Sequence, residues 1–431
     1  MRVNVVMQDP KALFVAPVNA LTEKWGVYAI PWMYRLPCGD LIVRANGHQD
    51  TQSPDYVQAV PDRFYRSSDG GDTWREVPVS PEVDLTFLFE NTFVPLPDGR
   101  WIRLATAEDL APIAGVPDRG DHTRSLNNEV IHNIYRYGDI PEACKRLQLE
   151  TYDSSGALLK TESAVLDFPE LLVTAVGGSL LTDGKEILVN EYVPVPEVRY
   201  PTYDSVSGIL PLPDGTLGGF ITGQDPEILG RAYDDLYFVA SADGGRTWKK
   251  RALIGGYDPV TTDGYTYENS CCVAPDGSLV AVMRTESCVP QAVEPFTGLM
   301  ISRSADCGHT WSAPVPLTDS SVTPHLIALK NGLLVLVYGR PGVHMRWSSD
   351  SGKTWSDPVT VIGKTLDRHR ALGDDYMDCK YWKMETYANT YMEAVSDDTV
   401  LLCYNDMKYP AGDGLDHRAT LVRKISFRRE D

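Results

Sequence analysis

One short pattern, Ser-x-Asp-x-Gly-x-Thr-Trp, occurs four times in this chain and constrains its fold more than any other feature. The copies span Ser67–Trp74, Ser241–Trp248, Ser304–Trp311 and Ser348–Trp355. The Ser and Asp side chains can accept hydrogen bonds from the amides of a tight turn, and Gly supplies a positive φ. Thr and Trp then begin a strand, where the indole can pack between neighbouring sheets. The repeats predict a recurring β unit, and we interpret the aspartates as turn residues rather than as catalytic or calcium-binding groups.

A second repeat consists of short apolar strands that enter and leave a turn of the Asp-Gly type. Six such turns are centred on Gly39, Asp98, Asp214, Asp276, Asn331 and Asp397. Each predicts a β-hairpin, and in most units a copy of the first motif follows. Two hairpins per unit make a blade of four antiparallel strands, so six units predict six blades.

Residues 107–200 depart from this regular spacing. A long polar segment covers 107–142, and the hairpin candidate Leu180–Val189 has no copy of the first motif after it. We interpret this candidate as an extra hairpin or an incomplete blade, so seven blades stay open. The last strand, Ala419–Phe427, has no turn after it and is expected to pair with N-terminal strands, which would close the ring. The prediction is a single all-β domain over residues 1–431.

The four copies are Asp-boxes, and through them the chain resembles the sialidase (neuraminidase) superfamily of β-propellers. This resemblance implies an all-β, six-bladed propeller of four-stranded antiparallel blades. It does not imply sialidase activity, because propellers with such boxes also cleave by elimination or only bind.

Composition excludes several classes of partner. The net charge of −19 argues against nucleic acid and anionic membranes, and no apolar run is long enough to span a bilayer. The first residues carry no signal-peptide pattern, although a leader could have been removed. The eight cysteines form no Cys-x-x-Cys pair. We expect reduced, buried thiols, with Cys271 and Cys272 on opposite faces of a strand, and a cytoplasmic location. Oligomeric state is not predicted.

Hairpin symmetry predicts which residues reach the rim of the propeller. Positions about eight residues before and after each Asp-Gly turn lie side by side at the far end of the hairpin. Glu268 and Arg284 are symmetric about Asp276 and should be neighbours, and a nearby Arg favours the charged form of a carboxylate. The resemblance implies that Glu268 assists the nucleophile and that Arg284 binds substrate.

Other site candidates come from the same rule and the same resemblance. Asp55, in the loop after the first hairpin, is the expected acid/base residue, with His48, Asp50 and Asp62 as neighbours to which that role could shift. The nucleophilic Tyr is Tyr387 or Tyr391, since strict spacing gives Asn389. Further substrate-binding candidates are His48, Arg44, Trp32, Asp204 and Arg340.

One departure from the family matters most for the substrate. Ala29 stands where the resemblance implies an Arg that binds the sialic acid carboxylate, and Arg35, Arg44, Arg340 and Arg346 are the possible replacements. We therefore predict a sialidase-like glycoside hydrolase that acts on a terminal sugar other than ordinary sialic acid. The alternatives are a lyase acting on uronic-acid glycans, with His48 as base, and a non-catalytic carbohydrate-binding propeller. The partner is a carbohydrate, and the chemistry needs neither metal nor cofactor.

Overall fold

The computed structural model describes the chain in segments. These cover residues 2–22, 26–48, 60–79, 93–107, 111–113, 115–116, 122–124, 130–145, 147–182, 187–194, 206–223, 235–256, 265–285, 298–318, 322–339, 342–363 and 390–430. The regular structure is almost entirely β, and two 3₁₀-helices, Tyr137–Asp139 and Glu142–Cys144, interrupt it. Among the described residues, no helix has the length and apolar character needed to cross a membrane.

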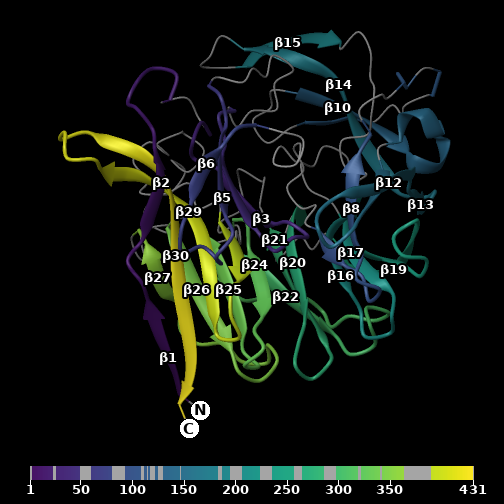
Figure 1. The fold of residues 1–431 in the computed structure, drawn as a ribbon. Helices are drawn as coiled ribbons and strands as arrows, with labels where there is room; N and C mark the ends of the chain where they lie inside the picture. Colours follow the sequence, from purple (N-terminus) through teal and green to yellow (C-terminus); the bar gives the residue numbers. More distant parts are fainter. Residues whose placement is uncertain are drawn as a thin grey trace.

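Six sheets form the blades of a β-propeller, as predicted (Figure 1). Blade 1 consists of β3 (Pro31–Arg35), β4 (Leu41–Ala45), β5 (Arg63–Ser67) and β6 (Arg75–Val77). Blade 2 consists of β7 (Val94–Pro95), β8 (Trp101–Thr106), β11 (Leu147–Tyr152) and β12 (Leu158–Ser163). Blade 3 consists of β16 (Ser207–Pro211), β17 (Leu217–Gly223), β18 (Asp235–Ser241) and β19 (Thr247–Gly255), with β13 (Val165–Asp167) added parallel to β19.

The remaining blades follow in chain order. Blade 4 consists of β20 (Tyr265–Val273), β21 (Leu279–Thr285), β22 (Leu299–Ser304) and β23 (Val315–Pro316). Blade 5 consists of β24 (His325–Ala328), β25 (Leu334–Gly339), β26 (Val343–Ser348) and β27 (Val359–Ile362). Blade 6 consists of β28 (Tyr391–Ala394), β29 (Thr399–Pro410) and β30 (Asp416–Glu430), joined by β1 (Arg2–Met7) and β2 (Lys11–Val15). Inner strands contact one another from blade 2 through blade 6 and from blade 6 to blade 1, which arranges the blades around a common axis.

Pairing between the two ends of the chain closes the ring. Both β1 and β2 pair antiparallel with β30, with Val5 opposite Phe427 and Ala12 opposite Leu421. Figure 1 accordingly shows the N- and C-termini beside each other. The predicted closure is confirmed, and it covers an edge of the last blade that would otherwise be open.

The Asp-boxes hold the turns between the two outer strands of their blades. In the first box, Thr73 N donates to Asp69 Oδ1 over 2.9 Å, Gly71 N donates to Ser67 Oγ over 2.9 Å, and Trp74 Nε1 donates to Gly71 O over 3.0 Å. The Asp and Ser bonds recur in the other three boxes. The interpretation of these aspartates as turn residues is therefore confirmed.

A seventh sheet lies outside the blades. It consists of β9 (His122–Arg124), β10 (Val130–Arg136), β14 (Leu172–Thr182) and β15 (Ile187–Pro194), in the order β15-β14-β10-β9. A segment inserted between β8 and β11 of blade 2 therefore pairs with a later segment that follows β13. Figure 1 shows this sheet at the top, at the end of the molecule opposite the termini. The propeller has six blades rather than seven, while the single-domain organisation stays a prediction.

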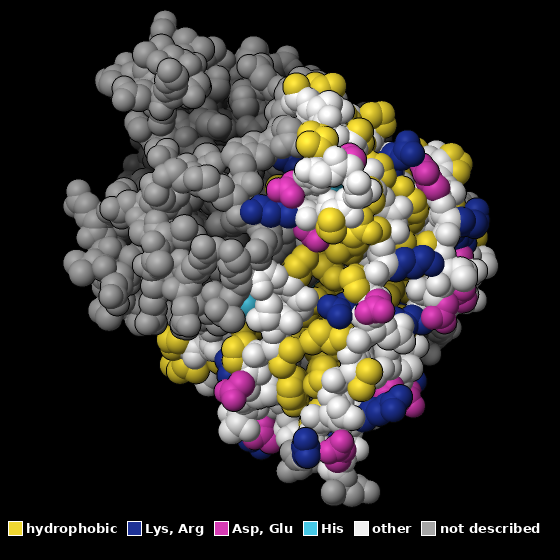
Figure 2. Space-filling model, turned by 90° about the vertical axis from the view of Figure 1, so that its left-hand side faces the viewer, with side chains coloured by type: hydrophobic (Ala, Val, Ile, Leu, Met, Phe, Trp, Pro, Cys, Tyr) yellow, Lys and Arg dark blue, Asp and Glu magenta, His cyan; other side chains and the backbone are white. Residues whose placement is uncertain are grey.

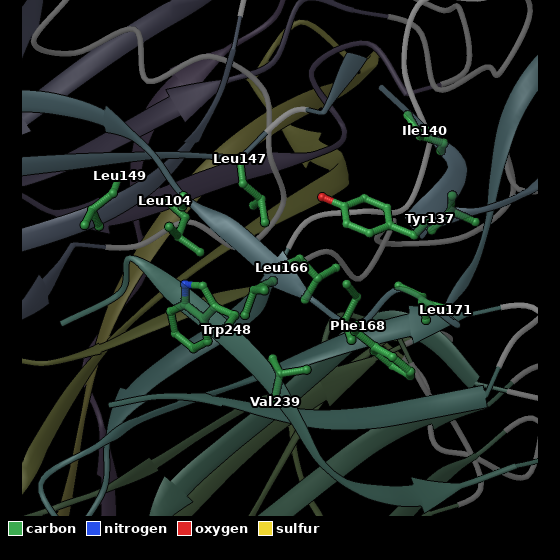
Figure 3. Packing of buried hydrophobic residues seen from close by; sticks show 14 of the residues in the cluster. Leu104, Tyr137, Ile140, Leu147, Leu149, Leu166, Phe168, Leu171, Val239 and Trp248 are labelled. Atoms are coloured by element: carbon green, nitrogen blue, oxygen red, sulfur yellow. The ribbon is translucent and has the colours of Figure 1, made fainter. Parts of the chain in front are cut away.

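The apolar core lies between neighbouring blades. Trp248 of the second Asp-box is fully buried and belongs to a cluster that includes Leu104 and Leu149 of blade 2 and Val239 of blade 3 (Figure 3). The same cluster also contains residues that lie between β10 and β14 in the sequence, such as Tyr137, Phe168 and Leu171. The indole thus packs between sheets, as the motif predicted.

The cysteines fit the prediction only in part. Cys271 and Cys272 belong to different core clusters, so their side chains do point to opposite faces of β20. Buried thiols are found at Cys272, Cys144 and Cys403, whereas Cys271 and Cys307 are partly buried. Cys38 is exposed because it lies in the turn between β3 and β4, so the expectation of burial is wrong there. Cys288 and Cys379 lie outside the described residues.

Charges of both signs are mixed on the described surface. On the face seen in Figure 2, Lys and Arg side chains lie close to Asp and Glu side chains, and apolar side chains lie between them. Ion pairs such as Lys424–Asp72, 2.6 Å apart, and Arg63–Glu76, 2.9 Å apart, contribute to this pattern. Within the described part of this face, no broad region carries one sign of charge.

Candidate functional site

A group of polar and aromatic side chains gathers at the end of the inner strands opposite the Asp-Gly turns. These residues come from blades 4, 5, 6 and 1, whose inner strands contact each other in that order. We call them the rim cluster, which comprises Glu268, Arg284, Thr323, His325, Tyr391 and Trp32. The chain thus brings together residues that are far apart in sequence.

An ion pair between Glu268 and Arg284 occupies one end of the rim cluster. Arg284 Nη1 lies 2.7 Å from Glu268 Oε2, and the two side chains are only 11% and 7% exposed. The pairing of β20 with β21 shifts between Tyr265 and Asn269, a bulge beside Glu268. The side chains still meet despite this irregularity, so the cross-strand contact expected from hairpin symmetry is present.

Thr323 supplies a second donor to the same carboxylate oxygen. Its backbone N donates to Glu268 Oε2 over 2.7 Å, and its carbonyl accepts a hydrogen bond from Thr390 Oγ1 over 3.2 Å. The backbone of Thr323 has a φ of 43°, which is unusual for a residue with a branched Cβ. The carboxylate of Glu268 is therefore held in place from two neighbouring blades.

Three aromatic rings complete the rim cluster. The ring of Tyr391 lies 4.7 Å from that of His325 and 5.4 Å from that of Trp32, measured between centroids. Burial lowers the pKa of His325 to about 4, although the nearby Glu268 carboxylate acts in the opposite direction. His325 is accordingly neutral at pH 7.

The hairpin rule, applied to the turn at Asn331, gives Thr323 eight residues earlier as a rim position but misses His325. Because side chains alternate along a strand, the residue two positions after Thr323 is the one expected on the same side. Applying that alternation at the start of β24 would have found His325.

The burial of the two aromatic candidates bears on their predicted roles. Tyr391 is 4% exposed and Trp32 is 9% exposed, and the two rings contact each other. In this conformation both serve as packing partners within the rim cluster. Nucleophilic attack by Tyr391 and stacking of Trp32 on a sugar stay predictions.

A second polar group lies in blade 1. Asp62 accepts hydrogen bonds from Gly47 N over 2.6 Å and forms an ion pair with Arg44 Nη2 at 2.5 Å. His48 Nε2 lies 3.8 Å from the same carboxylate. Arg44 and His48, predicted as substrate-binding residues, are therefore brought together around Asp62, which the sequence left open as an alternative to Asp55.

Two of the described replacements for the missing Arg, Arg35 and Arg346, bind away from the rim cluster. Ala29 is fully buried. Arg35 lies near the opposite end of β3, where it contacts Glu393 at 3.3 Å. Arg346 donates to the carbonyls of Ser356 over 2.7 Å and Leu317 over 2.6 Å. Arg44 lies opposite Trp32 on β4, where it pairs with Asp62, and Arg284 is the arginine that contacts Glu268.

Several predicted site residues lie outside the described residues. They are Asp55, Asp204, Arg340 and Tyr387. Their roles stay predictions. In the part of the chain that the structure describes, no group of three or more His, Cys, Asp or Glu side chains is arranged to hold a metal ion.

A family comparison agrees with the repeats and the architecture. Residues 209–411 match the family model of the BNR repeat-like domain. The chain is a six-bladed β-propeller that carries BNR-like repeats in this segment. The matched segment contains three of the four Asp-boxes, and the resemblance to the sialidase superfamily is confirmed for the fold and the repeats. No protein of curated function matches the sequence.

Solved structures of similar fold come from several organisms. A protein of unknown function from Dyadobacter fermentans is 14% identical, with a TM-score of 0.54 and coverage of 98% of this chain and 99% of that one. An alpha-L-arabinanase from Penicillium chrysogenum is 13% identical, with a TM-score of 0.48 and coverage of 96% and 98%. A sialidase from Streptococcus pneumoniae is 15% identical, with a TM-score of 0.43 and coverage of 97% of this chain and 70% of that one.

Proposed function

We propose that this BNR-repeat propeller is a glycoside hydrolase that releases a terminal sugar from a glycan or oligosaccharide. The observation that carries the proposal is the Glu268 carboxylate, buried at the rim and held by Arg284 Nη1 and Thr323 N, each 2.7 Å away. A catalytic carboxylate needs to be held in one orientation by neighbours whose own positions are fixed. Glu268 meets this requirement.

The proposed chemistry divides cleavage between two groups. Asp55 protonates the leaving oxygen as general acid. Glu268 attacks the anomeric carbon, or stabilises the positive charge that develops there, alone or through Tyr387 or Tyr391, as the glycosidic C–O bond breaks. Water then attacks the anomeric carbon, gives its proton to Asp55 and releases the sugar. Bond cleavage then requires no metal and no organic cofactor.

We further propose that the substrate sugar is not ordinary sialic acid. A sugar carboxylate is bound well by arginines whose charge is not already matched. Arg284 is paired with Glu268 and Arg44 with Asp62, while Arg35 contacts Glu393 far from the rim. Because these arginines are already paired with carboxylates, they are poorly suited to bind a sugar carboxylate. This supports a neutral sugar as substrate.

Release of sugar from a panel of aryl glycosides tests the proposal. The panel contains sialic acid, uronic acids, rhamnose, fucose, galactose and arabinose. We expect turnover of a neutral sugar, and a drop of about 10²–10⁴-fold in kcat for Glu268→Gln. Glu393→Gln is the matched control, because it also neutralises a Glu that pairs with an Arg, but far from the rim cluster. It should keep the kcat of the unmodified protein.

Four outcomes would contradict the proposal in different ways. Turnover of sialic acid would overturn the substrate class. Equal losses in Glu268→Gln and Glu393→Gln would indicate damage to the fold. Absorbance from a new double bond in uronic-acid glycans would indicate a lyase. Sugar binding without turnover by the unmodified protein would indicate a binding protein.

A further inference from the structure

Thr323 adopts a backbone conformation that its side chain disfavours. Among the described residues, the non-glycine residues with positive φ are Tyr28, Cys307, Thr323 and Ser351, and Thr323 alone is branched at Cβ. Such a residue at φ 43° is a steric outlier. Strain of this kind persists where surrounding contacts enforce it, and it gathers at functional sites.

In the part of the chain that the structure describes, the two hydrogen bonds of Thr323 both use its backbone atoms. Its N–H donates to Glu268 Oε2 and its carbonyl accepts from Thr390 Oγ1. A glycine would make both contacts without steric strain. These two hydrogen bonds therefore do not require a threonine at this position.

The hydroxyl of Thr323 is a second unfavourable feature. The residue is 6% exposed, and its Oγ1 is buried without a hydrogen-bond partner in the described part of the chain. A buried hydroxyl that lacks a partner is destabilising. The side chain thus weakens the fold in two independent ways, which suggests that it serves a ligand.

We propose that the Thr323 hydroxyl is a specificity-determining group that forms a hydrogen bond with a hydroxyl of the bound sugar. It rests on the proposed function, which supplies the sugar. The hydroxyl belongs to the residue whose N–H contacts Glu268, so it lies within a few ångströms of that carboxylate. His325, two residues further on, is partly exposed, so the molecular surface lies near Thr323, whose own Oγ1 is covered in this conformation. A sugar hydroxyl both donates and accepts, and either role satisfies a threonine.

Three substitutions separate the hydroxyl from the backbone. Thr323→Val keeps the branched shape and the N–H but removes the hydroxyl, whereas Thr323→Ser keeps the hydroxyl. On the aryl glycoside that the unmodified protein cleaves, we expect Thr323→Val to lower kcat/KM by about 10–100-fold and Thr323→Ser by less than about threefold. Thr323→Gly should lower kcat/KM as much as Thr323→Val while raising Tm, because it removes the strain and the buried hydroxyl together.

Ser351 provides the matched control for strain. It has a φ of 59°, is 7% exposed, and lies in the fourth Asp-box, where the first and second boxes have Gly70 and Gly244. Ser351→Gly should also raise Tm but should leave kcat/KM unchanged. Loss of activity from Thr323→Gly alone would then reflect the site rather than relief of strain.

Deoxy substrates identify the sugar group that Thr323 contacts. If the hydroxyl binds the sugar, removing its partner hydroxyl from the substrate should cost the unmodified protein as much kcat/KM as Thr323→Val costs on the full substrate. One monodeoxy glycoside should show this loss. Thr323→Val should then not distinguish that deoxy glycoside from the full substrate.

The outcomes also distinguish this inference from the proposed function. Full activity of Thr323→Val beside an active unmodified protein would overturn the inference and leave the hydrolase assignment standing. A lower Tm for Thr323→Val and Thr323→Gly would indicate a structural role and overturn it as well. An unmodified protein that neither cleaves the aryl glycosides nor binds the free sugars would overturn both.

Discussion

Arg35 and Glu393 form an ion pair that joins the first blade to the last. Arg35 Nε lies 3.3 Å from Glu393 Oε2, and Arg35 Nη2 donates to Ala394 O over 2.8 Å. The pair connects β3 and β28 near their turns, whereas Glu268 and Arg284 lie within one blade at the opposite rim. The same two residue types thus serve ring closure at one end and the candidate site at the other.

Removing the Arg35–Glu393 contact should weaken the junction without affecting the site. We expect Arg35→Met to lower the free energy of unfolding by about 1–2 kcal/mol, because the partly buried Glu393 loses its partner. Urea denaturation measures this change. Arg2→Met is the control: Arg2 pairs with Glu430 at 3.5 Å, but the side chains are 86% and 44% exposed, so its effect should stay below about 0.5 kcal/mol. Equal effects of the two substitutions would contradict a junction role for Arg35.

Two Asp-box tryptophans should differ in their contribution to stability. Both donate through Nε1 to a glycine carbonyl, Trp248 over 2.8 Å and Trp74 over 3.0 Å. Trp248 is fully buried between blades 2 and 3, whereas Trp74 is partly exposed. Trp248→Ala should therefore lower the free energy of unfolding by about 3–5 kcal/mol, and Trp74→Ala by clearly less. Denaturant titration of both variants checks the order, and a larger loss for Trp74→Ala would contradict it.

The Asp-boxes should make stability sensitive to acid. Hydrogen bonds from the Thr310 side chain and backbone N–H lower the pKa of Asp306 to about 2, below the value of about 3.9 expected in the unfolded chain. The stabilisation is present above about pH 4 and is lost as the pH falls through about 2. Asp306→Asn should make the free energy of unfolding depend less on pH between about pH 2 and pH 4. Denaturant titrations at several pH values in this range measure it. Parallel pH curves for the variant and the unmodified protein would contradict the prediction.

His417 should produce the opposite pH dependence. Its Nδ1 lies 2.8 Å from Ala16 O and its Nε2 lies 2.9 Å from Asp413 Oδ2. These contacts raise the pKa of His417, with the Ala16 carbonyl as the larger cause. Because the folded pKa is raised, the stabilisation is complete below the unfolded value of about 6.5 and is lost as the pH rises through the folded pKa.

His417→Gln tests this contact between the N-terminal segment and β30. We expect the variant to be less stable than the unmodified protein at pH 6, and the difference to shrink at alkaline pH. Thermal melts across this pH range measure it. A difference that grows with pH would show that the neutral imidazole makes the stabilising contact.

The Glu268–Arg284 contact could be predicted because it depends on one hairpin. Both residues lie on strands joined by the turn at Asp276, and the alternation of side chains places them together. The contacts of Glu268 with Thr323 and of Tyr391 with His325 cross from one blade to the next. No local pattern encodes them, because they depend on how neighbouring blades are rotated.

The sequence by itself determined the four-stranded blade repeat, its turns and the closure of the ring, while the choice between six and seven blades needed the structure. These features follow from hydrogen bonds within a few residues, such as Thr73 to Asp69, and from the two-residue period of strands. Only the tertiary structure decided that β10 pairs with β14 outside the blades and that Asp62 contacts Arg44. It also decided that Trp32, Tyr391 and His325 form one stack. The physical reason is that these contacts join residues distant in sequence, so they form only where packing of the whole ring brings those residues within reach.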